Sequence, residues 1–276
     1  MNFYSPLRYP GGKAFLVSEF ERIIKAIRTN KPIYVEPYAG GAGAALSLLF
    51  ADKVERIVIN DLDKSIYALW RSVTNESERF ARKVLRTPVT ISEWKKQKQI
   101  YLDDSADTFK RGFATFFLNR TNRSGVMNAG PIGGKEQVGL YKINARYNKK
   151  DLAVRIRKIG RYRNRIEVLN EDGIRLTKRY LGKKNTFIYL DPPYFRKGAM
   201  LYLNHYEGPD HEKLADLLNK NAERHWVLTY DEVAKIRNLY LDRARKRLDL
   251  KYRVRDSHKA RELMIFSDAL RVLKIS

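Results

Sequence analysis

Two short apolar runs, each ending in a polar turn, constrain the fold of this chain more than any other feature. Residues 33–35 lead into the segment Glu36–Gly43, and residues 57–59 lead into Asn60–Asp61. Between the runs, residues 44–50 are dense in alanine, leucine and phenylalanine and lack proline, which predicts a helix. Residues 64–73 continue as a second amphipathic helix. This strand–helix–strand–helix alternation is typical of a parallel sheet, so we expect an α/β fold.

The pattern changes after residue 73 and returns near residue 163. Residues 74–162 are polar, basic and helix-prone, with a stretch rich in glycine and asparagine at 119–139. Strand-like apolar runs then resume at 166–169, 186–190, 226–229 and 262–266. We therefore predict a sheet domain that is discontinuous in sequence, formed by residues 1–73 and 163–276, with residues 74–162 as an insert.

The charge balance points to a polyanionic partner. The 276 residues contain 55 lysines and arginines against 31 acids, a formal net charge of +24. Neutralising phosphates releases condensed counterions, so nucleic acid is the favoured partner. A ribosome-like protein or a membrane-surface protein stays open on charge alone. The hydrophobic fraction of 43% is enough for a packed core.

Features that the sequence lacks narrow the possible chemistry of the protein and its cellular compartment. The chain has no cysteine, which excludes disulfides, cysteine-ligated zinc and thiol nucleophiles. Residues 1–6 lack the apolar core of a signal peptide. The longest apolar stretch, residues 42–51, is too short to span a bilayer. We therefore expect a soluble intracellular protein.

The segment Asp191–Tyr194, with the sequence Asp-Pro-Pro-Tyr, directly follows the apolar run at 187–190. In an open α/β sheet, ligands bind beyond the carboxyl ends of the strands. Proline fixes φ and donates no hydrogen bond, so a stiff turn here presents a carboxylate, a carbonyl and an aromatic ring. Taken alone, the tetrapeptide is equally consistent with a simple turn that exposes an aspartate.

Such a turn suits the methylation of an exocyclic amine. The lone pair of adenine N6 is delocalised into the ring, and hydrogen-bond acceptors around N6–H would favour a pyramidal, nucleophilic nitrogen. The Asp191 carboxylate and the Pro192 carbonyl are suitable acceptors, and the Tyr194 ring can stack on the base. Catalysis of this kind rests on orientation and electrostatic preorganisation and needs no metal.

Three further features indicate a nucleotide-like ligand at the same sheet edge. The loop 36–43 is rich in small residues, although its glycines at 40, 41 and 43 do not form the dinucleotide pattern. Asp61 ends the next strand, where an acid commonly receives ribose hydroxyls. Asp172, beside Glu171, could meet the adenine amino group of the cofactor. The alternatives are ordinary strand-to-helix packing for the loop and a helix N-cap at Asp61 or Asp63.

The motifs stand in a fixed order along the chain: Pro6–Lys13, Val35–Gly43, Ile59–Asp61, Asp191–Tyr194, Trp226–Tyr230 and Arg261–Ile265. Together they resemble the Dam-type family of adenine-N6 DNA methyltransferases, nearly from end to end. In that family the first three motifs bind S-adenosylmethionine, the fourth is catalytic and the last two belong to the sheet. A long basic insert between the cofactor motifs and the catalytic motif is the family's target-recognition domain.

The resemblance implies a Rossmann-like S-adenosylmethionine methyltransferase sheet, mostly parallel with an antiparallel strand near the C-terminus. Helices would flank this sheet, and a small, mainly helical target-recognition domain would form from residues 74–162. The implied reaction moves a methyl group from S-adenosylmethionine to a flipped-out adenine in duplex DNA. The implied catalytic residues are Asp191, Pro192, Pro193 and Tyr194. The implied cofactor-binding residues are Tyr9, Gly12, Lys13, Glu36, Pro37, Tyr38, Gly40, Gly41, Asp61, Asp172 and Asp191.

The stretch 116–128 joins an aromatic helix end to a polar loop and resembles the family's recognition segment around Asn119 and Arg120. Arginine and asparagine can pair with guanine and adenine edges in the major groove. The predicted DNA-binding residues are Arg120, Asn122, Arg123, Asn128, Lys135 and Arg146. Beyond Gly125 the segment departs from the pattern associated with GATC, so no target sequence follows. The basic runs 146–165 and 242–255 are expected either to contact phosphates or to form solvated helix faces.

Several readings stay open at this point. An RNA adenine methyltransferase would share the cofactor site and the catalytic motif, and a cytosine-N4 enzyme would more often carry serine at position 191. A catalytically inactive DNA-binding relative is a third reading, and a nicotinamide-dependent dehydrogenase fits poorly with the glycine pattern. The expected partner is double-stranded DNA, with no membrane and no metal, in the cytoplasm of a prokaryotic or phage-infected cell. A cognate restriction endonuclease is a candidate partner, and the protein could be a monomer or a dimer.

Overall fold

The computed structural model describes residues 4–8, 13–27, 30–195, 206–250 and 260–271. Contacts divide the chain into two compact units. The helical unit comprises residues 1–17, 40–51 and 63–170, and the sheet unit comprises residues 18–39, 52–62 and 171–276. The predicted insert, residues 74–162, falls wholly within the helical unit. That it works as a separate recognition domain stays a prediction.

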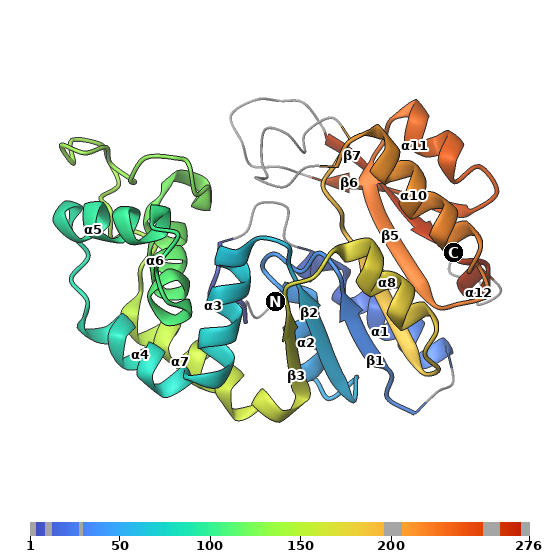
Figure 1. The fold of residues 1–276 in the computed structure, drawn as a ribbon, viewed down its shortest axis with the longest axis horizontal. Helices are drawn as coiled ribbons and strands as arrows, with labels where there is room; N and C mark the ends of the chain where they lie inside the picture. The colour runs from blue at the N-terminus through green and yellow to red at the C-terminus, as the bar shows by residue number, and fades with distance from the viewer. Residues whose placement is uncertain (1–3, 9–12, 28–29, 196–205, 251–259, 272–276) are drawn as a thin grey trace. The chain divides into compact units, whose positions relative to one another are not determined.

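Seven strands form a single sheet in the order β3-β2-β1-β4-β5-β7-β6 (Figure 1). β1 pairs in parallel with β2 and β4, and β4 with β5, whereas β7 is antiparallel to both β5 and β6. The prediction of a mostly parallel, Rossmann-like sheet with an antiparallel strand near the C-terminus is confirmed. The strands are β1 (Ile33–Glu36), β2 (Arg56–Asn60), β3 (Ile166–Leu169), β4 (Thr186–Leu190), β5 (Trp226–Asp231), β6 (Ala244–Leu250) and β7 (Ala260–Phe266).

The strand β6 was not predicted, because its sequence is dominated by charge. It occupies most of the described part of the basic run 242–255, whose residues 251–255 lie outside the described residues. Arg245, Lys246 and Arg247 are exposed on this edge strand. Exposed charges on an edge discourage pairing with strands of other chains, so the location explains the composition.

Aromatic packing holds α1 (Val17–Ala26) on the sheet. The ring of Phe20 lies 4.8 Å from that of Tyr189, 5.6 Å from that of Phe187 and 6.0 Å from that of Tyr34. α8 (Gly173–Leu181) packs on β4, and α10 (Gly208–Asn219) packs on α8. The remaining helices of the sheet unit are α11 (Ala234–Leu239) and α12 (Asp268–Arg271). Burial of both sheet faces in this way is typical of parallel strands.

The helical unit is built around α6 (Thr108–Thr121), which packs against α3 and α5, while α4 packs against α7 (Figure 1). Phe113, Phe116 and Phe117 of α6 are fully buried and meet Phe80 and Tyr147. The other elements are α2 (Gly43–Phe50), α3 (Lys64–Asn75), α4 (Ser77–Arg86), α5 (Ile91–Leu102) and α7 (Lys149–Arg161), with short 3-10 turns η1 (Ala14–Leu16), η2 (Arg123–Gly125) and η3 (Arg163–Arg165). No helix in the described part of the chain is long and apolar enough to cross a membrane.

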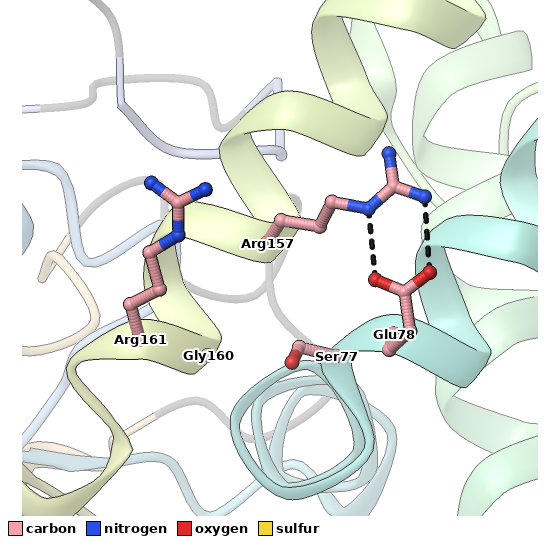
Figure 2. Close-up of a pocket in the computed structure, with 5 residues that line it drawn as sticks. All are labelled: Ser77, Glu78, Arg157, Gly160 and Arg161. Atoms are coloured by element: carbon pink, nitrogen blue, oxygen red, sulfur yellow. Dashed lines mark hydrogen bonds and ion pairs between the residues drawn. The ribbon is translucent and has the colours of Figure 1, made fainter.

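A surface depression marks the crossing of α4 and α7, lined by Ser77, Glu78, Arg157, Gly160 and Arg161 (Figure 2). Gly160 permits this crossing, since a Cβ there would lie 1.9 Å from Ser77 Oγ. The Arg157 guanidinium donates to both carboxylate oxygens of Glu78 at 2.8 and 3.1 Å. Arg157 and Arg161 belong to the basic run 146–165, but none of the individually predicted catalytic, cofactor-binding or DNA-binding residues lines the depression, so we interpret it as a feature of helix packing.

Candidate active site

The ends of four neighbouring strands meet at one edge of the sheet. The parallel registers pair Glu36 with Ile59, Val35 with Ile188, and Leu190 with Leu228. The segments that follow these strands therefore leave the sheet at the same edge, in the order β2, β1, β4, β5. The sheet thus brings together the predicted segments that begin at Pro37, Asp61 and Asp191. Ligands of open α/β sheets bind at this kind of edge.

Asp191 is held by hydroxyl donors. Its Oδ1 accepts a hydrogen bond from Thr229 Oγ1 at 2.7 Å and one from the Tyr194 hydroxyl at 3.2 Å. The Thr229 hydroxyl also lies 2.8 Å from the hydroxyl of Tyr189 on β4. A threonine hydroxyl that donates to Asp191 can accept from Tyr189, so the three groups form a relay that ends on the carboxylate. Asp191 itself is half-buried at the strand end.

Tyr189 and Tyr194 both stay protonated. Burial raises the pKa of Tyr194, and the negative charges of Asp191 and Glu262 raise it further. Burial also raises the pKa of Tyr189, again with Asp191 adding to the effect. Neutral phenols can donate hydrogen bonds, so Tyr194 can donate to the Asp191 carboxylate and Tyr189 to the Thr229 hydroxyl. That the Tyr194 ring also receives the target base stays a prediction.

Thr229 was missed as a site residue by sequence reasoning, which placed it only in a sheet motif. Its position in the sequence could have indicated this role. Thr229 is a hydroxyl residue at the end of an apolar run, and that run pairs with the strand that precedes Asp191. A fully buried hydroxyl needs a partner, and the nearest strand end carries an acid.

Asn60 joins two segments of the predicted cofactor site. It is buried, and its amide nitrogen donates to the carbonyls of Pro37 at 2.8 Å and Glu171 at 3.0 Å. Its amide oxygen accepts from the Glu171 backbone N–H at 2.8 Å. The backbone N–H of Ala39 donates to the Asn60 carbonyl. Asn60 therefore holds the turn after β1 beside the turn before α8.

Glu36 is buried and Tyr38 is half-buried, on either side of Pro37. Glu36 accepts a hydrogen bond from the Tyr34 hydroxyl at 3.0 Å. The Tyr38 ring packs on Gly173, where an added Cβ would lie 2.3 Å from a ring carbon. The Tyr38 hydroxyl lies 2.6 Å from the hydroxyl of Tyr206. Glycine at position 173 is thus required by the close approach of the Tyr38 ring.

Two of the acids after β2 and before α8 cap helices. Asp63, rather than Asp61, is the N-cap of α3, since its carboxylate accepts from Ser65 N at 2.7 Å. Asp172 is exposed and caps α8 by accepting from Arg175 N at 2.8 Å. Glu171 pairs with Arg179. Cofactor contacts from Asp61 and Asp172 stay predictions.

The remaining predicted cofactor residues belong to the helical unit or lie outside the described residues. Gly40 adopts a left-handed φ of 46°, and its carbonyl accepts from Trp70 Nε1 at 2.8 Å. Gly41 follows it in the turn before α2, and Lys13 is buried. Tyr9 and Gly12 lie outside the described residues.

In the predicted recognition segment, Asn119 and Asn122 use their side-chain amides for hydrogen bonds to other residues of the helical unit. Asn119 accepts from Arg8 N at 2.7 Å and donates to the carbonyls of Arg8 and Gly125, each at 3.0 Å. Asn122 is fully buried, accepts from Trp94 Nε1 at 2.7 Å and donates to the carbonyls of Val126 and Met127. Direct contact of Asn122 with DNA stays a prediction, and it would require this loop to open.

The other predicted DNA-binding residues are placed differently. Arg123, Asn128, Lys135 and Arg146 are exposed, whereas Arg120 is largely buried. Arg120 Nε is buried and has no hydrogen-bond partner among the described residues. Burial, and then the charges of Arg8 and Arg155, lower the pKa of Arg120 to about 10. A buried guanidinium beside like charges favours an anion as its partner.

Other predicted features have simpler roles. His211 is buried, and its Nδ1 lies 2.6 Å from the Tyr230 hydroxyl, which indicates a structural role. Among the described residues, no group of three or more histidines and acids is arranged to hold a metal ion.

A family model described as D12 class N6 adenine-specific DNA methyltransferase matches residues 9–254 of the chain. A search of curated proteins finds no match. Among solved structures, the rRNA methyltransferase aviRa from Streptomyces viridochromogenes is 13% identical, with a TM-score of 0.41 over 95% of this chain and 88% of that one. The protein LPL1258 from Legionella pneumophila is also 13% identical, with a TM-score of 0.33 over 94% and 86% of the two chains.

Proposed function

Because the chain belongs to the D12 class of N6 adenine-specific DNA methyltransferases, we propose that it methylates N6 of an adenine extruded from duplex DNA. The observation that carries this proposal is the carboxylate of Asp191 at the end of β4, held by Thr229 and Tyr194. A carboxylate fixed in this way can meet a substrate amine without rearranging, which is the condition for electrostatic preorganisation.

The proposed role of Asp191 is to accept a hydrogen bond from the N6 amino group. The Pro192 carbonyl, which follows it in the same turn, would accept the second N6–H. Two acceptors direct both N–H bonds away from the ring plane and leave the lone pair facing the methyl donor. S-adenosylmethionine, when bound, supplies an electrophilic methyl group on a sulfonium. Neither a metal nor a covalent enzyme intermediate enters this scheme.

The residues present fit S-adenosylmethionine. Carboxylates stand at the ends of β1 and β2, at Glu36 and Asp61, where ribose hydroxyls are commonly received. Gly40 supplies a left-handed turn that a side chain would strain, and such turns let backbone groups approach a ligand. The hydrogen bonds of Asn60 support the turns that carry Pro37 and Asp172. We propose that Lys13, Tyr38 and Gly41 complete the cofactor site with the N-terminal residues Tyr9 and Gly12.

Duplex DNA is the proposed substrate because of charge and its placement. The net charge of +24 favours a polyanion, and Arg120 with its neighbours Arg8 and Arg155 forms a half-buried cationic cluster. Asp151 balances this cluster only in part, since it pairs with Arg155 at 2.8 Å. We propose that Arg120 receives a backbone phosphate, while Arg123, Asn128, Lys135 and Arg146 provide exposed contacts. The cytoplasm of a prokaryotic or phage-infected cell, where such DNA lies, is the proposed compartment.

The test is to sequence DNA from cells that lack adenine methylation and express either the wild-type chain or Asp191→Asn. The wild type should place N6-methyladenine at one short sequence, and the variant should place none. Absence of N6-methyladenine with the wild type would refute the proposal. A competition between duplex DNA and structured RNA for labelled methyl groups then decides the substrate, because preferential labelling of RNA would replace DNA in this scheme. A fixed target sequence would also permit a cognate restriction endonuclease to be sought.

A further inference from the structure

The hydroxyl of Tyr206 meets the hydroxyl of Tyr38, a residue of the predicted cofactor site. The two oxygens lie 2.6 Å apart, and the two rings meet edge to face at 86° with 5.8 Å between their centroids. Both residues belong to the sheet unit. Tyr206 lies just before Glu207, the N-cap of α10, and is not among the predicted cofactor-binding residues. The fold therefore adds a second tyrosine to this part of the site.

The hydroxyl pair is held in place from both sides. The Tyr38 ring lies over Gly173, the first residue of α8, where an added Cβ would be 2.7 Å from the Tyr38 hydroxyl oxygen. On the other side, the Tyr206 ring packs edge-on against the ring of His211, with 5.6 Å between the centroids. The Tyr230 hydroxyl in turn holds His211 by its Nδ1, at 2.6 Å. The two hydroxyls are therefore positioned before a ligand binds, which lowers the entropy cost of binding.

Both phenols keep their protons near neutral pH. Burial raises the pKa of Tyr38 well above its ordinary value, and the neighbouring Tyr206 and Asp172 add to the effect. Burial also raises the pKa of Tyr206, again with the charge of Asp172 adding to the effect. Two hydroxyls that share one hydrogen bond place one proton between their oxygens, so the second O–H can donate elsewhere. The pair therefore offers a hydrogen-bond donor close to the Asp172 carboxylate.

A donor beside a carboxylate matches an edge of adenine. Adenine carries the N6 amino donor beside a ring nitrogen acceptor, which is N1 on one edge and N7 on the other. Asp172 uses its Oδ1 to cap α8, and a carboxylate has a second oxygen with which to accept from an amino group. The side chain of Asp172 is exposed, so a ligand can reach it. The donor and the acceptor can thus bind adjacent atoms of one base.

We propose that Tyr206, through its hydroxyl pair with Tyr38, recognises the adenine of S-adenosylmethionine by donating an O–H to the ring nitrogen beside the amino group. The amino group itself would meet the Asp172 carboxylate, as predicted from the sequence. Such a site rejects a base that lacks the matching acceptor, because a polar group of the site then loses its partner. The inference rests on the proposed function, because it takes S-adenosylmethionine as the cofactor.

The first experiment measures, by calorimetry and without DNA, how S-adenosylhomocysteine binds to wild type, Tyr206→Phe and Tyr240→Phe. Tyr240 is the matched control, because it is fully buried in the same unit and its hydroxyl has no hydrogen-bond partner among the described residues. Tyr206→Phe keeps the ring that packs on His211 and should weaken binding about five- to tenfold. Tyr240→Phe should bind within about twofold of wild type.

Three analogues of S-adenosylhomocysteine, each with one ring nitrogen replaced by C–H, separate recognition of the base from support of the fold. The 1-deaza and 7-deaza analogues each lack one acceptor beside the amino group, whereas the 3-deaza analogue keeps both and is the control. For one of the first two, wild type should lose about five- to tenfold in affinity and Tyr206→Phe should lose almost nothing, because the hydrogen bond is already absent. For the 3-deaza analogue, both proteins should lose by the same factor.

Two outcomes would overturn the inference. One is that Tyr206→Phe binds all four ligands as tightly as wild type, and the other is that it is weaker by the same factor for all four. In either case the proposed function stands as long as wild type methylates DNA. If wild type binds no S-adenosylhomocysteine and methylates no DNA, the proposed function fails and the role of Tyr206 fails with it.

Discussion

The corner at Asp191 and the predicted recognition segment, residues 116–128, both place polar residues after an apolar element, yet the structure uses these polar groups in opposite ways. At the corner, buried hydroxyls hold a half-buried carboxylate at a strand end. In the recognition segment, the side-chain amides of Asn119 and Asn122 donate hydrogen bonds to backbone carbonyls of their own loop and of its neighbours. A polar residue in a motif can therefore either face a ligand or stabilise the loop that presents other residues to the ligand.

The largest expected effect comes from Asp191→Asn. The amide keeps the size of the carboxylate but loses its charge and one acceptor oxygen, so the single-turnover rate of methyl transfer should fall about a hundred- to a thousandfold. Affinity for S-adenosylmethionine, measured by calorimetry, should stay within about threefold. The control is Asp216→Asn, at an exposed position of α10, which should retain the wild-type rate. A variant at 191 with more than about a tenth of the wild-type rate would remove this corner from catalysis.

The next prediction tests whether Asn122 stabilises the fold of the helical unit. Asn122→Ala leaves Trp94 Nε1 and the carbonyls of Val126 and Met127 without their amide partner. We expect the free energy of unfolding in urea to fall by about 2–3 kcal/mol, because buried polar groups lose their hydrogen bonds. Asn128→Ala, at an exposed position of the same segment, should change it by less than about 0.5 kcal/mol. Equal stability of the two variants would show that Asn122 does not support the loop.

A smaller effect tests the support behind Asp191. Thr229→Val preserves shape but removes the hydroxyl that bonds both Asp191 and Tyr189. The rate of methyl transfer should fall about tenfold, the equivalent of one hydrogen bond to a charged group. KM for DNA should change little, because Thr229 is fully buried. A rate change as large as that of Asp191→Asn would instead indicate that the turn itself had moved.

The smallest effect is a pH dependence of stability in the sheet unit. Burial lowers the pKa of His211 below its ordinary value of about 6.5. The folded protein therefore favours the neutral ring, and its stability is full above pH ~6.5 and declines as pH falls below that value. Unfolding in urea at pH 7 and pH 5 should show a smaller loss for His211→Gln than for wild type. An identical loss in both proteins would mean that His211 does not contribute to the acid sensitivity.

The sequence by itself determined the strands of the sheet other than β6, the helices between the first strands, the position of Asp191–Tyr194 after β4 and the preference for a polyanion. These follow from local apolar patterns and total charge, which need no knowledge of distant contacts. Only the tertiary structure decided that Thr229 supports Asp191, that Asn60 joins two turns of the predicted cofactor site and that Asn122 is buried and bonded to Trp94. Those pairs are 38, 111 and 28 residues apart, so their hydrogen bonds depend on how the chain folds back on itself, which no local pattern records.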